Sequence, residues 1–209
     1  MKKTDIIFNE LFERYPVLES VRDDVYGAFL LMKKCYENGG KVMTCGNGGS
    51  AADCEHIVGE LMKGFILRRE LSDGDIALFE DGEIPKKLQY GLPAISLVSQ
   101  SGIISAFAND VSADNVFAQQ VFAYAQNEND VLIALSTSGN SKNIGNAVKT
   151  AKAKNIKTLG ITGSKGGLLG GLCDVCIKLP SDVTFEIQEL TLPVYHALCA
   201  MIEEEFFGV

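Results

Sequence analysis

The chain has 209 residues, of which 46% are hydrophobic and 22% are charged, and its formal net charge is −8 at pH 7. These values are ordinary for a globular protein with a real core and exclude a disordered chain. An acidic chain has no electrostatic footprint for nucleic acid, and no apolar run approaches the roughly 20 residues of a membrane span. We therefore expect neither nucleic acid nor a membrane as a partner.

The first segment, residues 1–38, is predicted to be helical, with two helices that break at Pro16. The second helix carries apolar residues at helical spacing from Leu18 to Met32. The first mixes apolar and charged residues in the pattern of an amphipathic helix and lacks the apolar core of a signal sequence. We therefore expect a cytoplasmic protein whose six cysteines are reduced thiols.

Strands and helices alternate after this segment. Helices are predicted at about 52–67, 103–125 and 141–154, with a final helix over about 182–207. Apolar runs predict strands at 41–45, 94–98, 131–135, 158–161 and 175–179. Alternating strands and helices imply parallel βαβ units, and continuously apolar strands imply a sheet covered on both faces. The sequence predicts an α/β fold, a three-layer doubly wound sandwich with a five-stranded parallel sheet, as a single domain over residues 1–209.

Residues 68–92 do not fit this alternation. They are polar, contain three glycines and a proline, and show no clear period. A connection of this length in a compact domain is typical of a lid, a binding loop or a mobile segment. We treat 68–92 as an inserted loop.

The sequence Ser136-Thr137-Ser138-Gly139-Asn140-Ser141 follows a predicted strand and begins a helix. Ligands of open parallel sheets bind beyond the carboxyl ends of strands, where a helix N-terminus presents free N–H groups to an anion. The alternative is an ordinary capped turn, because Ser and Thr are favoured caps. Four hydroxyls in six residues exceed what capping needs, so we favour phosphate binding.

The loop Cys45–Ser50 follows the first strand in the same way. It lacks the lysine of a P-loop and the last glycine of a dinucleotide fingerprint. It is consistent with either a plain turn or a close approach to a small polar ligand.

The chain has only two histidines. His56 precedes Glu60 by four residues on a predicted helix, so both side chains share one helix face. His196 follows Gln188 by eight residues, which is about 12 Å of helical rise. Spacing alone leaves open whether these residues form a site or are unrelated core and surface residues.

Taken together, these motifs resemble the sugar isomerase (SIS) domain, and within it the phosphoheptose isomerases. The resemblance rests on GNGGSAA, on STSGNS, on the pair Asn109-Asp110 and on the set His56, Glu60, Gln188 and His196. It implies Glu60 as the general base, His196 as the general acid, and zinc as a cofactor. It implies zinc ligation by His56, Glu60, Gln188 and His196, and substrate binding by Asn47, Gly48, Gly49, Ser50, Glu60, Asn109, Asp110, Ser136, Thr137, Ser138, Ser141 and Gln188.

The implied reaction is aldose–ketose isomerisation of a sugar phosphate through an enediol, with sedoheptulose 7-phosphate as the expected substrate. One carboxylate can move the carbon-bound proton while a second group exchanges protons with the oxygens. Glu60 is hard to use as a tight zinc ligand and a free base at once, so we expect the metal to be exchangeable. The chain departs from the family at Lys63-Gly64, where we expect an arginine, and at Glu186, where we also expect one.

Two other functions fit parts of the pattern. One is a non-catalytic phosphosugar-binding SIS protein or a factor that associates with the replication initiator, which we expect to lack Glu60 and His196. The other is a zinc hydrolase, for which four protein ligands leave no open position for water. The resemblance also implies a homotetramer with its sites at subunit interfaces, and the apolar faces of the N-terminal helices are consistent with burial there.

Overall fold

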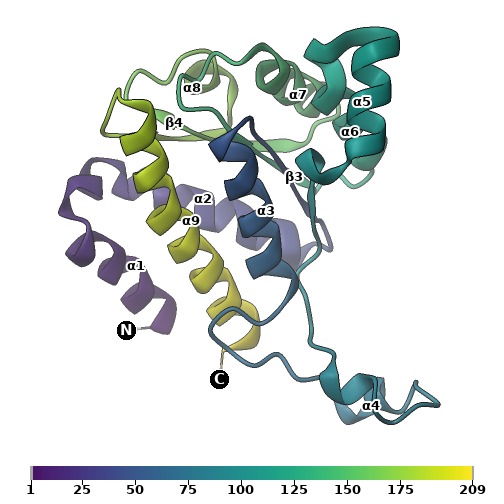
Figure 1. Ribbon diagram of the computed structural model, residues 1–209. Coiled ribbons are helices and arrows are strands. Elements are labelled where there is room, and N and C mark those ends of the chain that lie inside the picture. Colours follow the sequence, from purple (N-terminus) through teal and green to yellow (C-terminus); the bar gives the residue numbers. More distant parts are fainter. Residues whose placement is uncertain (1, 209) are drawn as a thin grey trace.

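The computed structural model describes residues 2–208, and within them five parallel strands form one sheet in the order β2-β1-β3-β4-β5 (Figure 1). The strands are β1 (Val42–Cys45), β2 (Ala94–Ser96), β3 (Val131–Leu135), β4 (Lys157–Gly163) and β5 (Val175–Leu179). Thr44 on β1 lies opposite both Ser96 on β2 and Ile133 on β3. The chain therefore winds outward from β1 in one direction to β2 and in the other to β3, which places a topological switch point between β1 and β3.

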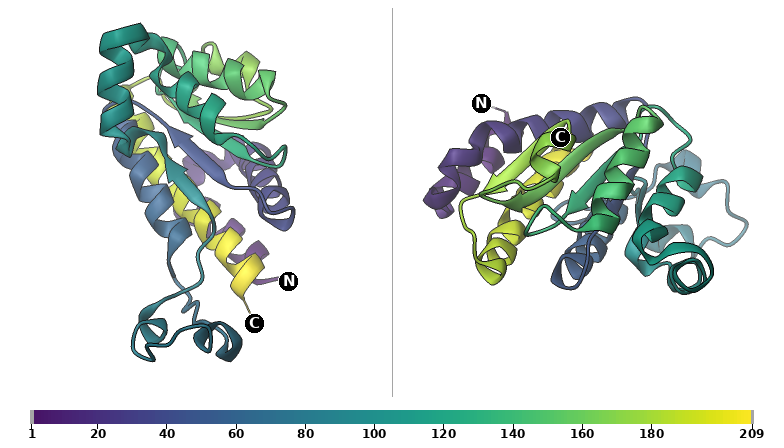
Figure 2. Two further views of the ribbon diagram at one scale, coloured as in Figure 1. Left: turned by 90° about the vertical axis from the view of Figure 1, so that its right-hand side faces the viewer. Right: turned by 90° about the horizontal axis from the view of Figure 1, so that it is seen from above.

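Helices cover both faces of the sheet, as the view from above shows (Figure 2). One face carries α1 (Lys3–Arg14), α2 (Arg22–Glu37), α3 (Gly49–Met62) and α9 (Thr184–Phe207). The other face carries α5 (Ser101–Phe107), α6 (Val116–Tyr124), α7 (Lys142–Ala153) and α8 (Leu169–Leu172). This arrangement confirms the predicted three-layer α/β sandwich with a five-stranded parallel sheet.

The continuous apolar runs of the strands follow from this double cover. On β3, Val131, Ile133 and Leu135 pack into the core beneath α1, α2, α3 and α9. Leu132 and Ala134 point the other way, into the core beneath α6 and α7. Successive side chains of a strand point to opposite faces, so a strand buried on both faces has to be apolar at every position.

The N-terminal helices break where the sequence predicts. α1 ends at Arg14, and Pro16 then begins a 3₁₀ helix (Pro16–Val21) that leads into α2. Proline suits a helix start because its missing N–H would have no helical partner there. Both α1 and α2 pack against α9, so this segment belongs to the sandwich rather than to a separate unit.

Residues 68–92, called the arm below, extend away from the sandwich (Figures 1 and 2). The arm contains the short helix α4 (Asp73–Ile76) and a 3₁₀ turn (Pro85–Lys87). Its two ends are joined by an antiparallel bridge between Glu70 and Gln89. The arm is therefore an excursion that returns to its starting point before the chain enters β2.

Two predicted helices have different limits in the structure. The helix predicted at 52–67 begins at Gly49 and ends at Met62, because the carboxylate of Glu203 binds the backbone N–H groups of residues 65–67 in a non-helical turn. The helix predicted at 103–125 is interrupted by a π-helical turn (Ala108–Ser112) and a 3₁₀ turn (Ala113–Asn115). This stretch is rich in Asn, Asp and Ser, whose side chains compete for backbone hydrogen bonds.

Further 3₁₀ residues follow β2 at Leu97–Ser99. No helix in the described part of the chain is long and apolar enough to cross a membrane.

Candidate active site

The glycine loop and the STSGNS loop lie side by side at the switch point. Both follow adjacent parallel strands, β1 and β3, so their carboxyl ends meet at the same edge of the sheet. The side chains of Asn47 and Asn143 join the two loops by a reciprocal pair of amide hydrogen bonds, each 2.9 Å long. Asn143 was not among the predicted site residues, and its direct contact with Asn47 makes it part of the loop pair.

The glycines of the first loop are required by close contacts and by backbone conformation. Gly48 adopts a positive φ of 57°, which side chains other than that of glycine rarely allow. A Cβ on Gly49 would come within 2.4 Å of Gln188 Nε2, and a Cβ on Gly46 within 2.6 Å of the Ser50 carbonyl oxygen. The loop is therefore packed against the start of α9 and brings Gln188 to the N-terminus of α3.

The STSGNS loop forms the predicted strand–loop–helix turn. Ser136 and Ser141 approach each other with their Oγ atoms 3.0 Å apart, and Ser138 Oγ accepts a hydrogen bond from Asn140 N. Gly139 has a φ of 68°, and a Cβ there would collide with the Gly166 carbonyl. Ser141 precedes α7 without capping it through its side chain, so its hydroxyl stays with Ser136 at the helix N-terminus.

The pair Asn109 and Asp110 lies in the π-helical turn after α5, and both residues are exposed. Asn109 Nδ2 donates to Asp110 Oδ1 over 2.7 Å. Among the described residues the two side chains therefore bond to each other rather than to the glycine loop.

Helices α3 and α9 run side by side in the same direction (Figure 1). This arrangement positions the remaining predicted site residues, which lie on these two helices. Gln188 meets Gly49 at the start of both helices, and Tyr195 meets His56 about two turns further along. Glu203 then contacts the turn that follows α3. Each of these residues on α9 thus contacts a residue that lies at a similar distance along the chain from the start of α3.

His56, Glu60 and His196 come together in the middle of this helix pair. The Nε2 atoms of His56 and His196 are 3.4 Å apart, and His56 Nε2 is 3.2 Å from Glu60 Oε1. The other carboxylate oxygen of Glu60 forms an ion pair with Lys63 Nζ at 3.2 Å. Three of the four predicted metal ligands therefore converge, whereas Gln188 lies against Gly49, about 10 Å of helical rise from His56.

The electrostatic environment keeps His196 neutral. Partial burial lowers the pKa of His196 from 6.5, repulsion by His56 when that ring is protonated and by Arg14 lowers it further, and Glu60 opposes the shift. A neutral imidazole at neutral pH can donate a hydrogen bond from one ring nitrogen and accept one at the other. His196 can thus exchange a proton with a substrate oxygen without first losing a charge.

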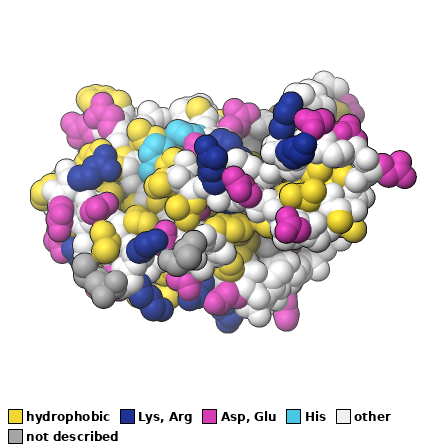
Figure 3. Space-filling model, turned by 90° about the horizontal axis from the view of Figure 1, so that it is seen from below, with side chains coloured by type: hydrophobic (Ala, Val, Ile, Leu, Met, Phe, Trp, Pro, Cys, Tyr) yellow, Lys and Arg dark blue, Asp and Glu magenta, His cyan; other side chains and the backbone are white. Residues whose placement is uncertain are grey.

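A cavity of about 330 Å³ opens beside His196, between α1 and α9. Apolar side chains such as Leu11, Phe65 and Leu192 line it, and Arg14 contributes a cation. Figure 3 shows the histidine side chains reaching the surface among hydrophobic, basic and acidic groups on the face seen from below. The arm itself does not line this cavity, although the residues just before it do.

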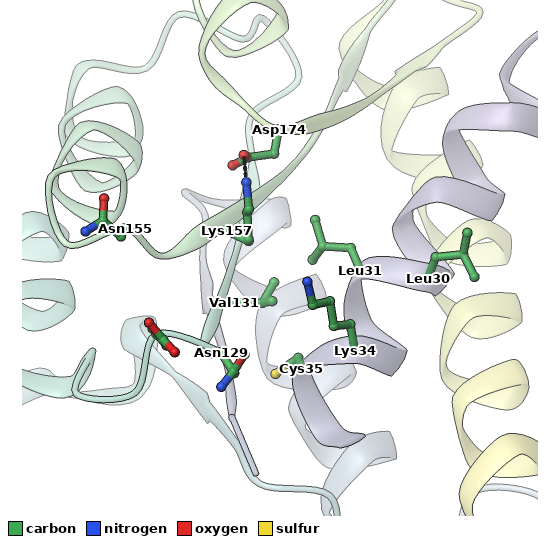
Figure 4. Close-up of a pocket in the computed structure, with 10 residues that line it drawn as sticks. Leu30, Leu31, Lys34, Cys35, Asn129, Val131, Asn155, Lys157 and Asp174 are labelled. Atoms are coloured by element: carbon green, nitrogen blue, oxygen red, sulfur yellow. Dashed lines mark hydrogen bonds and ion pairs between the residues drawn. The ribbon is translucent and has the colours of Figure 1, made fainter. Parts of the chain in front are cut away.

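A second cavity, of about 530 Å³, lies at the opposite end of the sheet (Figure 4). It is bounded by Val131 and Lys157, which begin β3 and β4, and by the Lys157–Asp174 ion pair. No predicted site residue lines it. The amino ends of the strands are also not where parallel sheets bind their ligands.

Comparisons with known proteins show the family to which the chain belongs. Models of the SIS domain match residues 10–91 and 103–201. The chain is 40% identical to phosphoheptose isomerase 2 of Campylobacter jejuni over 184 residues, covering 88% of this chain and 81% of that protein. It is 37% identical to phosphoheptose isomerase of Helicobacter pylori over 206 residues, covering 99% and 95%. The chain belongs to the phosphoheptose isomerase family of SIS-domain proteins.

Solved structures of the family show the same fold. A phosphoheptose isomerase from Francisella tularensis superposes with a TM-score of 0.77 at 31% identity, covering 98% of this chain and 100% of that one. The phosphoheptose isomerase from Neisseria gonorrhoeae gives a TM-score of 0.75 at 30% identity, covering 97% of each chain. The family therefore extends over the whole sandwich, including the N-terminal helices.

The donor atoms of this phosphoheptose isomerase family member fit zinc in part. Neighbouring ligand atoms of a tetrahedral zinc site lie about 3.3 Å apart when the Zn–N bonds are 2.0–2.1 Å long. The 3.4 Å between the two Nε2 atoms and the 3.2 Å from His56 Nε2 to Glu60 Oε1 match this spacing. Within residues 2–208, however, no group of three or more His, Cys, Asp or Glu side chains is arranged so that it could hold a metal ion. The donor types and two of the spacings suit zinc, but the three side chains do not form a complete site as they stand, and Gln188 lies apart from them.

A buried ion pair that the sequence did not indicate fixes the end of α3. Arg69 Nε lies 2.8 Å from Glu203 Oε1, with both side chains almost fully buried. Arg69 also donates to the backbone carbonyls of Glu60 and Leu61. Arg69 therefore holds the backbone of Glu60 in place through the carbonyl group of that residue. The partners Arg69 and Glu203 are too far apart in sequence for spacing to have revealed them.

Proposed function

We propose that this member of the phosphoheptose isomerase family interconverts an aldose phosphate and a ketose phosphate. The proposed substrate is sedoheptulose 7-phosphate, and the product is glycero-manno-heptose 7-phosphate. The observation that carries the proposal is the contact of His56 Nε2 with both Glu60 and His196 in the middle of the α3–α9 pair. The relatives from Campylobacter jejuni and Helicobacter pylori support this substrate, because both are named phosphoheptose isomerases and are 40% and 37% identical to this chain.

The phosphate would bind at the STSGNS loop, where Ser136, Thr137, Ser138 and Ser141 supply hydroxyls at the N-terminus of α7. A helix N-terminus favours an anion through its free N–H groups and its partial positive charge. This local site suits a chain whose net charge of −8 gives no long-range attraction for phosphate.

The sugar would extend from the phosphate along the α3–α9 pair. Asn47, Gly48, Gly49 and Ser50 lie where the glycine loop meets α3, and Gln188 lies against them. In this position Asn47 and Gln188 would form hydrogen bonds with hydroxyl groups of the sugar. Asn109 and Asp110 would bind further hydroxyls from the turn after α5, and for this they must exchange the hydrogen bond that they now make with each other.

The proton transfers fall to Glu60 and His196. Isomerisation moves a proton between C1 and C2 and shifts a second proton between O1 and O2. Glu60 is the proposed base for the carbon-bound proton, and the neutral imidazole of His196 is the proposed donor to the oxygen. Lys63, 3.2 Å from Glu60, would place a positive charge beside the developing enediolate, one residue before the position of the expected arginine.

We propose zinc as an exchangeable cofactor held by His56, Glu60, His196 and Gln188. When bound, zinc would supply an electrophile that stabilises negative charge on the substrate oxygens. Gln188 has to leave Gly49 to join the other three. Glu60 would then be both a zinc ligand and the base, which is why the metal is proposed to be exchangeable.

We further propose that the enzyme is a homotetramer with its sites at subunit interfaces and that it acts in the cytoplasm. The cavity beside His196 is open to solvent in one chain, and apolar residues such as Val17, Tyr26 and Leu30 are exposed on the N-terminal helices. The six free cysteines are compatible with a reducing compartment.

A coupled assay with sedoheptulose 7-phosphate and other ketose phosphates, with and without added zinc, tests the reaction. Turnover of the heptose phosphate, with a loss of at least 100-fold in kcat for Glu60→Gln, supports the proposal. Lack of turnover of every sugar phosphate would instead favour a non-catalytic SIS protein. A pull-down with the replication initiator would then test whether the protein is a factor that associates with that initiator.

A further inference from the structure

The hydroxyl of Tyr195 lies between His56 and Asp53. It is 2.8 Å from His56 Nδ1 and 3.3 Å from Asp53 Oδ1. Tyr195 is almost fully buried, with 2% of its surface exposed. Neither Tyr195 nor Asp53 holds or reacts with substrate in the function proposed above, so their contact with His56 has no assigned role.

The single hydroxyl hydrogen of Tyr195 decides which atom donates in each of these two hydrogen bonds. The phenol of Tyr195 has one hydrogen to donate, and a carboxylate such as that of Asp53 can only accept. Within residues 2–208, Tyr195 is the sole hydrogen-bond or ion-pair partner that the structure gives Asp53. A half-buried carboxylate left without a donor is costly, and hydrogen bonds to a charged acceptor are the stronger ones.

The hydrogen of Tyr195 therefore goes to Asp53, and its oxygen is left to accept. The neighbouring atom, His56 Nδ1, must then be the donor. In a neutral imidazole one nitrogen carries the hydrogen and the other does not. His56 Nε2 is then bare, with its lone pair directed at the site.

We propose that Tyr195 and Asp53 are positioning residues that fix His56 in the tautomer protonated at Nδ1. The consequence for catalysis rests on the function proposed above, whereas the tautomer itself does not. A bare Nε2 lies 3.4 Å from His196 Nε2, from which it can accept a hydrogen bond. It also lies 3.2 Å from Glu60 Oε1. Both of these atoms are acceptors, so they can share only a cation or the proton of a neutral Glu60 carboxyl, whereas the opposite tautomer would donate its N–H to the Glu60 carboxylate and leave Asp53 without a donor.

The rings are also held in place by packing. Tyr195 meets His56 edge to face, with centroids 5.4 Å apart and an interplanar angle of 73°. His196 meets His56 in the same manner at 4.9 Å and 84°. On its Nδ1 side the orientation of His56 is thus set by the hydrogen bond to Tyr195, and the two ring contacts add to it. A hydrogen bond of this kind on the other ring nitrogen commonly orients a metal-binding imidazole.

Nitrogen NMR on metal-free protein labelled with ¹⁵N-histidine tests the tautomer. The chain has two histidines, so only four ring nitrogens contribute signals. At mildly alkaline pH we expect the hydrogen of His56 on Nδ1. A wild-type protein with that hydrogen on Nε2 overturns the proposal, and this reading needs no variant.

Three variants separate positioning from a general structural role. Tyr195→Phe removes the acceptor of Nδ1–H, and Asp53→Ala frees the Tyr195 hydroxyl to donate to Nδ1. Both should move the hydrogen of His56 to Nε2, and the double variant should do no more than Tyr195→Phe alone. The matched control is Tyr36→Phe, which removes a buried hydroxyl that has no partner. An unchanged tautomer in both single variants overturns the proposal.

Metal affinity and kinetics give the second readout. For Tyr195→Phe we expect about 10-fold weaker zinc binding or more and a similar fall in kcat with little change in KM, as for other outer contacts of metal ligands. Unaltered zinc affinity and kcat in Tyr195→Phe would overturn the claim that the tautomer of His56 contributes to metal binding and catalysis. An inactive wild type with its hydrogen on Nδ1 would instead overturn the proposed function and leave the positioning intact.

Discussion

Arg69 and Glu203 form a buried ion pair that joins the foot of the arm to the last turns of α9. Their Nε and Oε1 atoms are 2.8 Å apart. The carboxylate of Glu203 also accepts hydrogen bonds of 2.7–3.0 Å from the backbone N–H groups of Phe65, Ile66 and Leu67. With four donors on one carboxylate, the pair meets the condition under which a buried charge can be stable.

Breaking this pair is expected to destabilise the protein strongly. Arg69→Met leaves the carboxylate of Glu203 with its backbone donors but without its cation, and removing one partner of a buried pair typically costs about 3–5 kcal/mol. Urea unfolding measures the change. The control is Glu205→Gln, which removes the partly exposed pair with Lys33 and should cost about 1 kcal/mol or less. Equal losses in the two variants would contradict a special role for Arg69.

The same carboxylate should make stability depend on acid. Burial alone would raise the pKa of Glu203, but the backbone donors and Arg69 outweigh it and hold the pKa below 4.5. A carboxylate with a lowered folded-state pKa stabilises the fold above its unfolded pKa and loses that contribution as pH falls through the folded value. Unfolding free energies measured below pH 5 should therefore fall more steeply in the wild type than in Glu203→Gln. Parallel curves would count against this assignment.

His196 should titrate below pH 6.5, because burial and the neighbouring positive charges lower its pKa. Its neutral form is the one stabilised by folding, so acid that protonates it should weaken both the fold and the site. The measurement is a ring-proton NMR titration of metal-free protein. His196→Asn assigns the signal, and a midpoint above 6.5 would disprove the expectation.

Gly49 should be intolerant of a side chain although it lies in a helix. A Cβ there would reach within 2.4 Å of Gln188 Nε2, so Gly49→Ala must displace Gln188 from the glycine loop. We expect KM for the sugar phosphate to rise several-fold. On the same helix, a Cβ on Gly59 would meet no atom within 4 Å from other described parts of the chain. Gly59→Ala should leave the kinetics unchanged and stabilise the protein by about 0.5–1 kcal/mol. Similar KM values for both variants would refute the role of this contact.

The sequence was sufficient for the fold because its signals are local. Runs such as 131–135 are apolar at every position, which predicts buried strands. Composition also predicts the helix break, through Pro16, and the loop Ser136–Ser141, through its serines, threonine and glycine. The π-helical turn at 108–112 was missed because the surrounding residues are apolar at helical spacing.

The site was predictable in its chemistry and less so in its geometry. The spacing of His56 and Glu60 implies one helix face, and the structure brings His196 to them. Contacts such as Tyr195 with Asp53 or Arg69 with Glu203 join residues more than 130 positions apart. No periodicity links such pairs, so they become visible only when α3 and α9 lie side by side.

The bridge between Glu70 and Gln89 makes the arm a removable module. Tyr90 N also donates to the Arg69 carbonyl over 2.7 Å, so the chain enters and leaves the arm at neighbouring points. A segment whose ends already meet can be lengthened, shortened or replaced by a tight turn with only a small change in closure entropy. The outer part of the arm can therefore be altered without disturbing the sandwich, while Arg69 at its base ties the end of α3 to Glu203 on α9.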